Sequence, residues 1–186
     1  MSKLSIIKIY PENYELKSFC LNNACQTVNG SLLDSSTLYS LIHNMFETLY
    51  DYPSGVGLSA NQVGIMLRLC VIDFKRDAKK PIVCINPEYS PLSDEKMMSK
   101  EQCLSFPNVS ANVQRYNRIR INYQNVHGEE KEMIAEGFKS FVFQHEIDHL
   151  NGIVFFDRID TFKDLNDYEG YTFRLAHNAM EVIKNG

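Results

Sequence analysis

The segment from Phe138 to Leu150 constrains the fold most, because its residues recur at the spacing of an α-helix. One stripe of that helix would hold Phe138, Phe141, Val142, His145 and His149. Residues at i and i+4 share a helix face, so the two imidazoles can bind one metal ion. Glu146 can reach a water molecule at that ion and serve as general base. The same pattern also arises in ordinary amphipathic helices, with two packed or surface histidines among solvated acids.

Two histidines do not complete a catalytic metal site, which needs three protein ligands and one open position. The candidates downstream of the helix do not extend the pattern in a recognised way; they are Asp157, Asp160, Asp164 and His177. Upstream, Cys103 lies in the segment Glu101–Pro107. A thiolate is a good ligand for zinc, iron or nickel, so Cys103 is a further candidate ligand.

The remaining periodicity predicts helices that bracket a run of strands. Helical spacing recurs from Leu38 to Leu49, with Asp34, Ser35 or Ser36 available as N-cap, and again near Tyr171 to Lys184. Short apolar or alternating segments predict strands at Met66–Phe74, Ile82–Asn86, Arg118–Tyr123 and Lys131–Ala135, with a hairpin turn at Val126–Glu129. This order indicates a single α+β domain over residues 1–186 and not a doubly wound parallel sheet.

Charge and cysteine content narrow the class of protein. The formal net charge is −4, which does not favour broad binding to nucleic acid or to an anionic membrane. No apolar run is long enough to span a bilayer, and the start Met1–Lys8 does not read as a signal peptide. The five cysteines lack the paired spacing of a zinc ribbon or disulfide scaffold, which suits a reducing compartment. Cys70 and Cys84 lie in apolar runs, and we expect them to fill the core.

A third segment, Gly55–Gly64, is rich in glycine and small residues, which permit tight turns and close approach to a ligand. Alone, it predicts only a helix-to-strand turn. Taken together, however, three segments resemble the motifs of the peptide deformylases. Gly55–Gln62 is similar to the family's Gly-x-Gly-Leu-Ala-Ala-x-Gln loop, Glu101–Ser105 to its Glu-Gly-Cys-Leu-Ser segment, and Gln144–His149 to its Gln-His-Glu-x-Asp-His helix. Their order and approximate spacing agree, and the similarity extends from Ile9 through Arg158.

This resemblance implies a fold and a metal centre. The fold would have antiparallel or mixed strands around a central helix that carries the two histidines, with a C-terminal helix. Cys103, His145 and His149 would bind one divalent metal ion, with water in the fourth place. The ion in this family is commonly ferrous iron, and zinc, nickel or cobalt can occupy the same site.

The implied activity is hydrolysis of the N-formyl group from the formyl-methionine of newly made polypeptides, with release of formate. The metal-bound water would attack the formyl carbon, while Glu146 takes its proton and later passes it to the leaving amine. The side-chain amide of Gln62 and the backbone N–H of Leu104 would hold the oxyanion. The chemistry is consistent with a metal ion, because bound metal can lower the pKa of water to about 7.

The resemblance also implies surroundings for the metal centre. An apolar slot for the methionine side chain would be lined by Val56, Gly57, Phe138, Phe141 and Val142. For Phe138 and Phe141, packing in the core is an equally good interpretation. Glu101 resembles a family position that braces the site and can pair with an arginine, and Asp148 would orient a charge such as Arg115. A plain surface position is the alternative for both carboxylates.

Several positions depart from the family pattern. Gln102 stands where the family usually has glycine, so it would narrow or re-aim the cleft, and we count it among the substrate-binding residues. Ser59 replaces the usual first alanine of the glycine-rich loop. Ser110 stands where bacterial relatives often carry a basic residue near the entrance, and Asn151 replaces a commoner aspartate or small residue. These departures concern substrate preference more than the metal centre.

The implied partner is the nascent formyl-methionyl polypeptide in the cytoplasm, without stable binding to nucleic acid or membrane. In some bacterial members the C-terminal helix makes transient contact with the ribosome. The tail after Asp160 is slightly acidic here, which gives such docking on RNA little support. The alternatives are a zinc endopeptidase, which Cys103 argues against, and a silent relative that only binds metal or formyl peptides. Intact Glu146 and Gln62 argue against the second.

Overall fold

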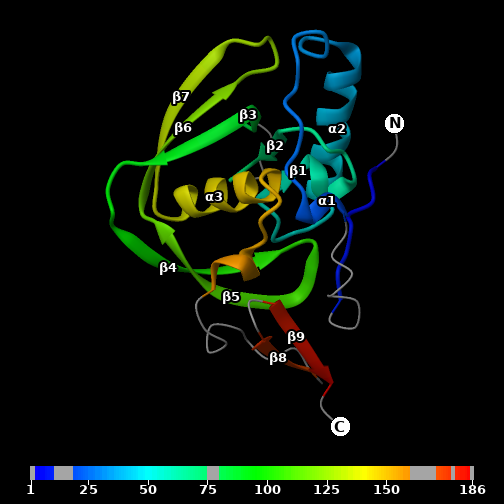
Figure 1. Ribbon diagram of the computed structural model, residues 1–186. Coiled ribbons are helices and arrows are strands. Elements are labelled where there is room, and N and C mark those ends of the chain that lie inside the picture. The colour runs from blue at the N-terminus through cyan, green and yellow to red at the C-terminus, as the bar shows by residue number, and fades with distance from the viewer. Residues whose placement is uncertain (1–2, 11–18, 75–79, 160–170, 177–178, 185–186) are drawn as a thin grey trace.

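The computed structural model describes residues 3–10, 19–74, 80–159, 171–176 and 179–184 (Figure 1). Its main sheet has the order β1-β2-β3-β6-β7, and every neighbouring pair is antiparallel. These strands are β1 (Gly57–Ser59), β2 (Leu69–Ile72), β3 (Ile82–Pro91), β6 (Arg118–Gln124) and β7 (Glu130–Glu136). A second sheet pairs β4 (Lys96–Cys103) with β5 (Phe106–Tyr116). The α+β prediction is therefore confirmed.

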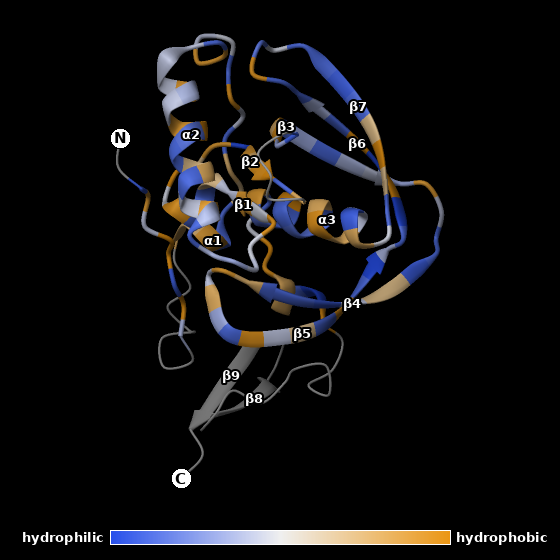
Figure 2. Ribbon diagram, turned by 180° about the vertical axis from the view of Figure 1, so that it is seen from behind, coloured by the Kyte–Doolittle hydropathy of each residue, from blue (hydrophilic) through white to orange (hydrophobic). Residues whose placement is uncertain are grey.

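Helix α3 (Phe138–Leu150) lies between the five-stranded sheet and the β4–β5 pair (Figures 1 and 2). Its buried side chains Phe143, Ile147 and Leu150 pack in one cluster with Cys70 and Cys84 of the sheet. Both cysteines are fully buried, as predicted from their apolar surroundings. The helix that carries the two histidines is thus held on both sides by strands.

Helix α2 (Ser36–Tyr50) covers the other face of the same sheet. Successive strand residues point to opposite faces, and in β2 the side chains of Leu69 and Val71 belong to the α2 cluster, whereas Cys70 belongs to the α3 cluster. Of the three candidate N-caps, Ser35 takes the position, since its Oγ accepts a hydrogen bond from Leu38 N at 3.1 Å. Strand β2 is therefore buried on both faces, which explains its uninterrupted apolar sequence.

Short elements complete the described fold. They are the helix α1 (Phe19–Asn22), the 3₁₀ turns η2 (Ala60–Val63) and η3 (Phe155–Arg158), and the strands β8 (Tyr171–Ala176) and β9 (Ala179–Lys184). A third cluster packs η3 against the β4–β5 pair through Phe106, Phe155 and Phe156. Within the described ranges, no helix combines the length and apolar character needed to cross a membrane.

The C-terminal segment corrects one prediction. Where helical spacing predicted a helix near Tyr171 to Lys184, the structure has the antiparallel pair β8–β9, with Tyr171 opposite Lys184 and Ala176 opposite Ala179. The reason lies in residue type. Aromatic and β-branched residues, which favour strands, are frequent in Tyr171–Phe173 and again at Val182 and Ile183.

Candidate metal centre

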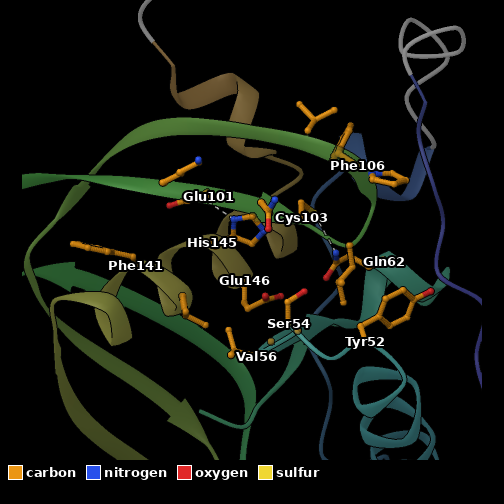
Figure 3. Close-up of a pocket in the computed structure, with 18 of the residues that line it drawn as sticks. Tyr52, Ser54, Val56, Gln62, Glu101, Cys103, Phe106, Phe141, His145 and Glu146 are labelled. Atoms are coloured by element: carbon orange, nitrogen blue, oxygen red, sulfur yellow. Dashed lines mark hydrogen bonds and ion pairs between the residues drawn. The ribbon is translucent and has the colours of Figure 1, made fainter. Parts of the chain in front are cut away.

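Three side chains from two elements converge on one point beside α3. Figure 3 shows two of them, Cys103 and His145. One ligand atom each from Cys103, His145 and His149 lies within 4.8 Å of the other two. Cys103 ends β4, and its Sγ is 3.2 Å from Nε2 of His149. A register shift between Gln102 and Cys103 interrupts the β4–β5 ladder at this point, and such bulges re-aim side chains next to active sites. The structure thus brings together the three predicted ligands.

The ring of His145 is oriented by a carboxylate. Its Nδ1–H donates to Oε2 of Glu101 at 2.9 Å, which leaves Nε2 with its lone pair directed away from Glu101. This is the usual arrangement for a histidine that binds a metal through one nitrogen and a carboxylate through the other. One thiolate and two imidazoles form a donor set that suits zinc, iron or nickel, so the residues present fit a divalent metal ion.

Behind Glu101 lies a buried arginine. Arg115 on β5 donates to Oε1 of Glu101 through Nε at 2.8 Å and to Oε2 at 3.0 Å, and it also bonds Asp148 of α3. Burial alone would raise the pKa of Glu101, but the hydrogen bonds from Arg115 and His145 outweigh it and lower that pKa to about 2. Both carboxylates are therefore buried and paired, and neither occupies the plain surface position that was the alternative.

The amide of Gln62 is fixed in one orientation. Its Oε1 accepts hydrogen bonds from N and Oγ of Ser59, each at 3.0 Å. Its Nε2 consequently faces the metal-ligand side, where it lies 3.1 Å from Oγ of Ser105 and 3.4 Å from Sγ of Cys103. The hydroxyl of Ser59, a departure from the family pattern, thus adds a second donor that holds Gln62 in place.

Glu146 lies at the floor of the same site and is buried. Burial raises the pKa of Glu146 to about 7, because few neighbours compensate a charge there. Among the described residues, its Oε2 has no hydrogen-bond partner. An orphaned carboxylate oxygen beside three ligand atoms is suited to exchange a proton with a bound water molecule or substrate.

A cavity of about 650 Å³ opens onto these groups. The residues predicted for the apolar slot line it, namely Val56, Gly57, Phe138, Phe141 and Val142, and so do Glu101 and Gln102. Leu104 also lines it, directly after Cys103 in the turn between β4 and β5. Phe138 is 62% exposed, which favours the cavity over the core for this residue. Ser110, by contrast, is not among the residues that line the cavity, although it pairs with Gln102 in the β4–β5 ladder.

Three contributors were missed by the sequence reasoning. Asn61 Nδ2 donates to the backbone oxygen of His149 at 2.6 Å, Ser105 accepts from Gln62, and Arg158 donates to Asp148. Asn61 lies in the segment Gly55–Gln62 and Ser105 in Glu101–Ser105, so their places in these motifs could have indicated a role at the site. Arg158 follows the helix by several residues and carries no comparable signal.

The chain is similar to proteins of one known family. The family model described as polypeptide deformylase matches residues 7–164. The peptide deformylase of Bartonella bacilliformis is 46% identical over 154 residues, which cover 78% of this chain and 84% of the relative. That of Aquifex aeolicus is 46% identical over 123 residues, which cover 64% of this chain and 72% of the relative.

Solved structures give the same result. The crystal structure of a peptide deformylase from Thermotoga maritima superposes with a TM-score of 0.75 at 36% identity, covering 87% of this chain and all of that one (100%). A class I type b peptide deformylase from Acinetobacter baumannii, solved with Met-Ala-Ser bound, has a TM-score of 0.74 at 32% identity. The match covers 85% of this chain and 99% of that one.

Proposed function

This chain belongs to the polypeptide deformylase family, hydrolases that remove the N-formyl group from new polypeptides, and we propose that it does so at Cys103, His145 and His149 with Glu146 as general base and acid. The observation that carries the proposal is the convergence of the three ligand atoms within 4.8 Å, beside a buried carboxylate. Two of the ligands, Cys103 and His145, border one cavity together with Glu146, Gln62 and Leu104.

The proposed mechanism assigns each step to particular residues. A divalent cation held by Cys103, His145 and His149 would supply a Lewis acid that makes water nucleophilic at neutral pH. Glu146 would accept the proton of the attacking water and deliver it to the leaving amine, which keeps the amine from departing as an anion. A pKa of about 7 suits a group that must do both near neutrality. Formate and a free N-terminal amine would be the products.

Negative charge develops on the formyl oxygen as the tetrahedral intermediate forms. The fixed amide of Gln62 and the backbone N–H of Leu104 would donate to that oxygen. Because Ser59 already holds Oε1 of Gln62, little reorganisation is needed when the charge appears. The two donors would therefore stabilise the transition state more than the bound substrate.

The substrate proposed is a nascent formyl-methionyl polypeptide. Val56, Phe138, Phe141 and Val142 give the cavity an apolar wall that suits a thioether side chain. The Met-Ala-Ser bound by the Acinetobacter baumannii relative is the corresponding deformylated peptide. New chains begin at the ribosome, so we place the activity in the cytoplasm with transient access to ribosomes. Iron, zinc, nickel and cobalt all remain candidates for the ion.

Turnover of formyl-Met-Ala-Ser tests this function, with the metal content determined on the same anaerobic sample. We expect formate and free Met-Ala-Ser, with rate proportional to bound metal. An unformylated peptide with the same sequence should stay intact, since cleavage of an internal bond would instead indicate an endopeptidase. Metal binding without turnover of the formyl peptide would identify a silent relative and refute the proposal.

Replacement of Gln62 by leucine should lower kcat by roughly 10²- to 10³-fold, because one oxyanion donor is lost at nearly constant volume. Metal content should stay that of the parent, since Gln62 is not a ligand. The measurement is steady-state kinetics on formyl-Met-Ala-Ser with metal analysis. An unchanged kcat would show that Gln62 does not face the developing charge.

Replacement of Gly57 by alanine should disturb Glu146 specifically. A Cβ at Gly57 would lie 2.5 Å from Oε1 of Glu146 and 2.9 Å from its Cδ, so the flexible carboxylate must move. A displacement of about 1 Å in a catalytic group can cost roughly 100-fold in rate, which is the loss in kcat that we expect. Gly30→Ala is the control, because no atom lies within 4 Å of its added Cβ. Equal kcat in the two variants would contradict the close approach.

A further inference from the structure

Four charged side chains lie end to end behind His145. Glu101 bonds Arg115, and Arg115 bonds Asp148 of α3. Asp148 is in turn held by Arg158 of η3, whose NH2 donates to Oδ1 at 2.7 Å and whose Nε donates to Oδ2 at 3.1 Å. The chain of contacts therefore runs from Arg158 to the carboxylate that orients the His145 ring.

Arg158 differs from the other three charged residues in its exposure to solvent. The side chains of Glu101, Arg115 and Asp148 are 2–6% exposed, whereas that of Arg158 is 38% exposed. The three buried groups together carry one more negative than positive charge, and Arg158 balances that excess. Without Arg158, the buried carboxylate of Asp148 would have Arg115 as its one cationic partner among the described residues, and Arg115 also pairs with Glu101.

The turn η3 contacts α3 at two matched points. Residues at i and i+3 of a 3₁₀ turn point the same way, as do residues at i and i+3 of an α-helix. At the first point, Phe155 of η3 packs on the ring of His145, with ring centroids 6.1 Å apart. At the second point, Arg158 bonds Asp148, and each of these residues lies three positions further along its own element. The backbone N–H of Val154 donates to Asp157 at 2.9 Å and fixes the start of this turn. In Figure 1, η3 is the orange segment that follows α3 and lies next to the β4–β5 pair.

From these contacts we infer that Arg158 is a positioning residue for the metal centre. The two hydrogen bonds from its guanidinium fix Asp148, which in turn fixes Arg115. Arg115 then holds Glu101, whose carboxylate orients the ring of His145. The inference rests on the proposed metal-binding role of His145. A lysine could restore the charge at position 158 but not two parallel hydrogen bonds, because an ammonium group lacks the planar fork. The geometry of the fork, and not charge alone, is what this role requires.

The test uses the full chain loaded with Co²⁺, whose visible absorption reports the thiolate and imidazole ligands directly. In Arg158→Gln we expect the cobalt spectrum to change shape and Co²⁺ release to a chelator to become about tenfold faster, as for other groups that orient metal ligands. The kcat for formyl-Met-Ala-Ser should fall by about tenfold, with KM within about twofold of the parent. Arg158→Lys should lie between the parent and Arg158→Gln in all three measurements.

Arg68→Gln is the matched control. Arg68 bonds the backbone oxygen of Leu150 at 3.4 Å and the side chain of Asn151 at 2.7 Å, so it also braces the end of α3. It forms no hydrogen bond or ion pair with Asp148 among the described residues. Its loss should lower the melting temperature while leaving the cobalt spectrum and release rate as in the parent. Parental spectra and release rates in both Arg158 variants would overturn the inference, whatever their stability. A parent protein that takes up no Co²⁺ would overturn the metal centre itself, which is a separate and distinguishable result.

Discussion

Replacement of Glu146 by glutamine is expected to lower kcat by about 10³- to 10⁴-fold, the upper part of the range for a general acid–base group. Glutamine has nearly the same shape but cannot accept a proton at neutral pH. The proposed role uses the carboxylate twice, once with the attacking water and once with the leaving amine. Metal content should remain parental, because the three ligand atoms come from Cys103, His145 and His149.

Kinetics on formyl-Met-Ala-Ser and metal analysis of the same sample measure this effect. Glu136→Gln serves as control, since Glu136 ends β7, its side chain is 68% exposed, and it is not among the residues that line the cavity. Loss of activity together with loss of metal would show that Glu146 is needed for metal binding, and would not support a role in proton transfer. Parental turnover by Glu146→Gln would rule out the proposed base.

Helix α3 shows how far a local pattern can predict structure. The bounds Phe138–Leu150 follow from periodicity and coincide with those observed. The stripe that held Phe138 and Phe141 was compatible with either core or pocket, and the structure places both residues at the cavity wall. Periodicity identifies a face of a helix, but what covers that face depends on elements distant in sequence. Here Phe143, Ile147 and Leu150 form the side that packs on the sheet.

The hairpin β4–β5 shows where the same reasoning fails. Strand β4 begins with the exposed residues Lys96, Met97 and Met98, and alternate burial starts only at Ser99. With no apolar period over its first half, the segment gave no strand signal, although it carries Cys103 and Glu101. Resemblance to family motifs located these residues, whereas propensity did not. The β8–β9 pair is the opposite case. There the helical spacing of apolar residues led to a predicted helix, whereas the strand-favouring residues indicated the strands that the structure has.

The candidate site divides in the same way. Residues within contiguous motifs, such as His145, Glu146 and Gln62, were predicted from the sequence and lie together. The buried network was only partly predictable, because Arg115 lies 14 residues from Glu101 and 33 from Asp148. Arg158 joins it from a turn after the helix. Such ion pairs depend on how β5, α3 and η3 pack, which no local pattern encodes.

This network leads to the largest stability effect that we expect. Arg115 is the only residue in the described chain that forms ion pairs with both Glu101 and Asp148, and its side chain is 2% exposed. Burial opposes its charge, but its two carboxylate partners outweigh that effect and raise the pKa of Arg115. Removing one partner of a buried ion pair leaves the other charges desolvated and unpaired.

Replacement of Arg115 by methionine should therefore lower the free energy of unfolding by about 3 kcal/mol or more. Urea unfolding of chelator-treated proteins measures this without a contribution from metal affinity. Arg118→Met is the matched control, because the side chain of Arg118 is 53% exposed and its Nε lies 3.9 Å from Oε2 of Glu136. This replacement should change the free energy of unfolding by no more than about 0.5 kcal/mol. In the double variant Arg115→Met/Asp148→Asn, the loss should be smaller than the sum of the two single losses, since opposite charges leave together. Strict additivity, or equal effects at Arg115 and Arg118, would show that the buried network does not stabilise the fold.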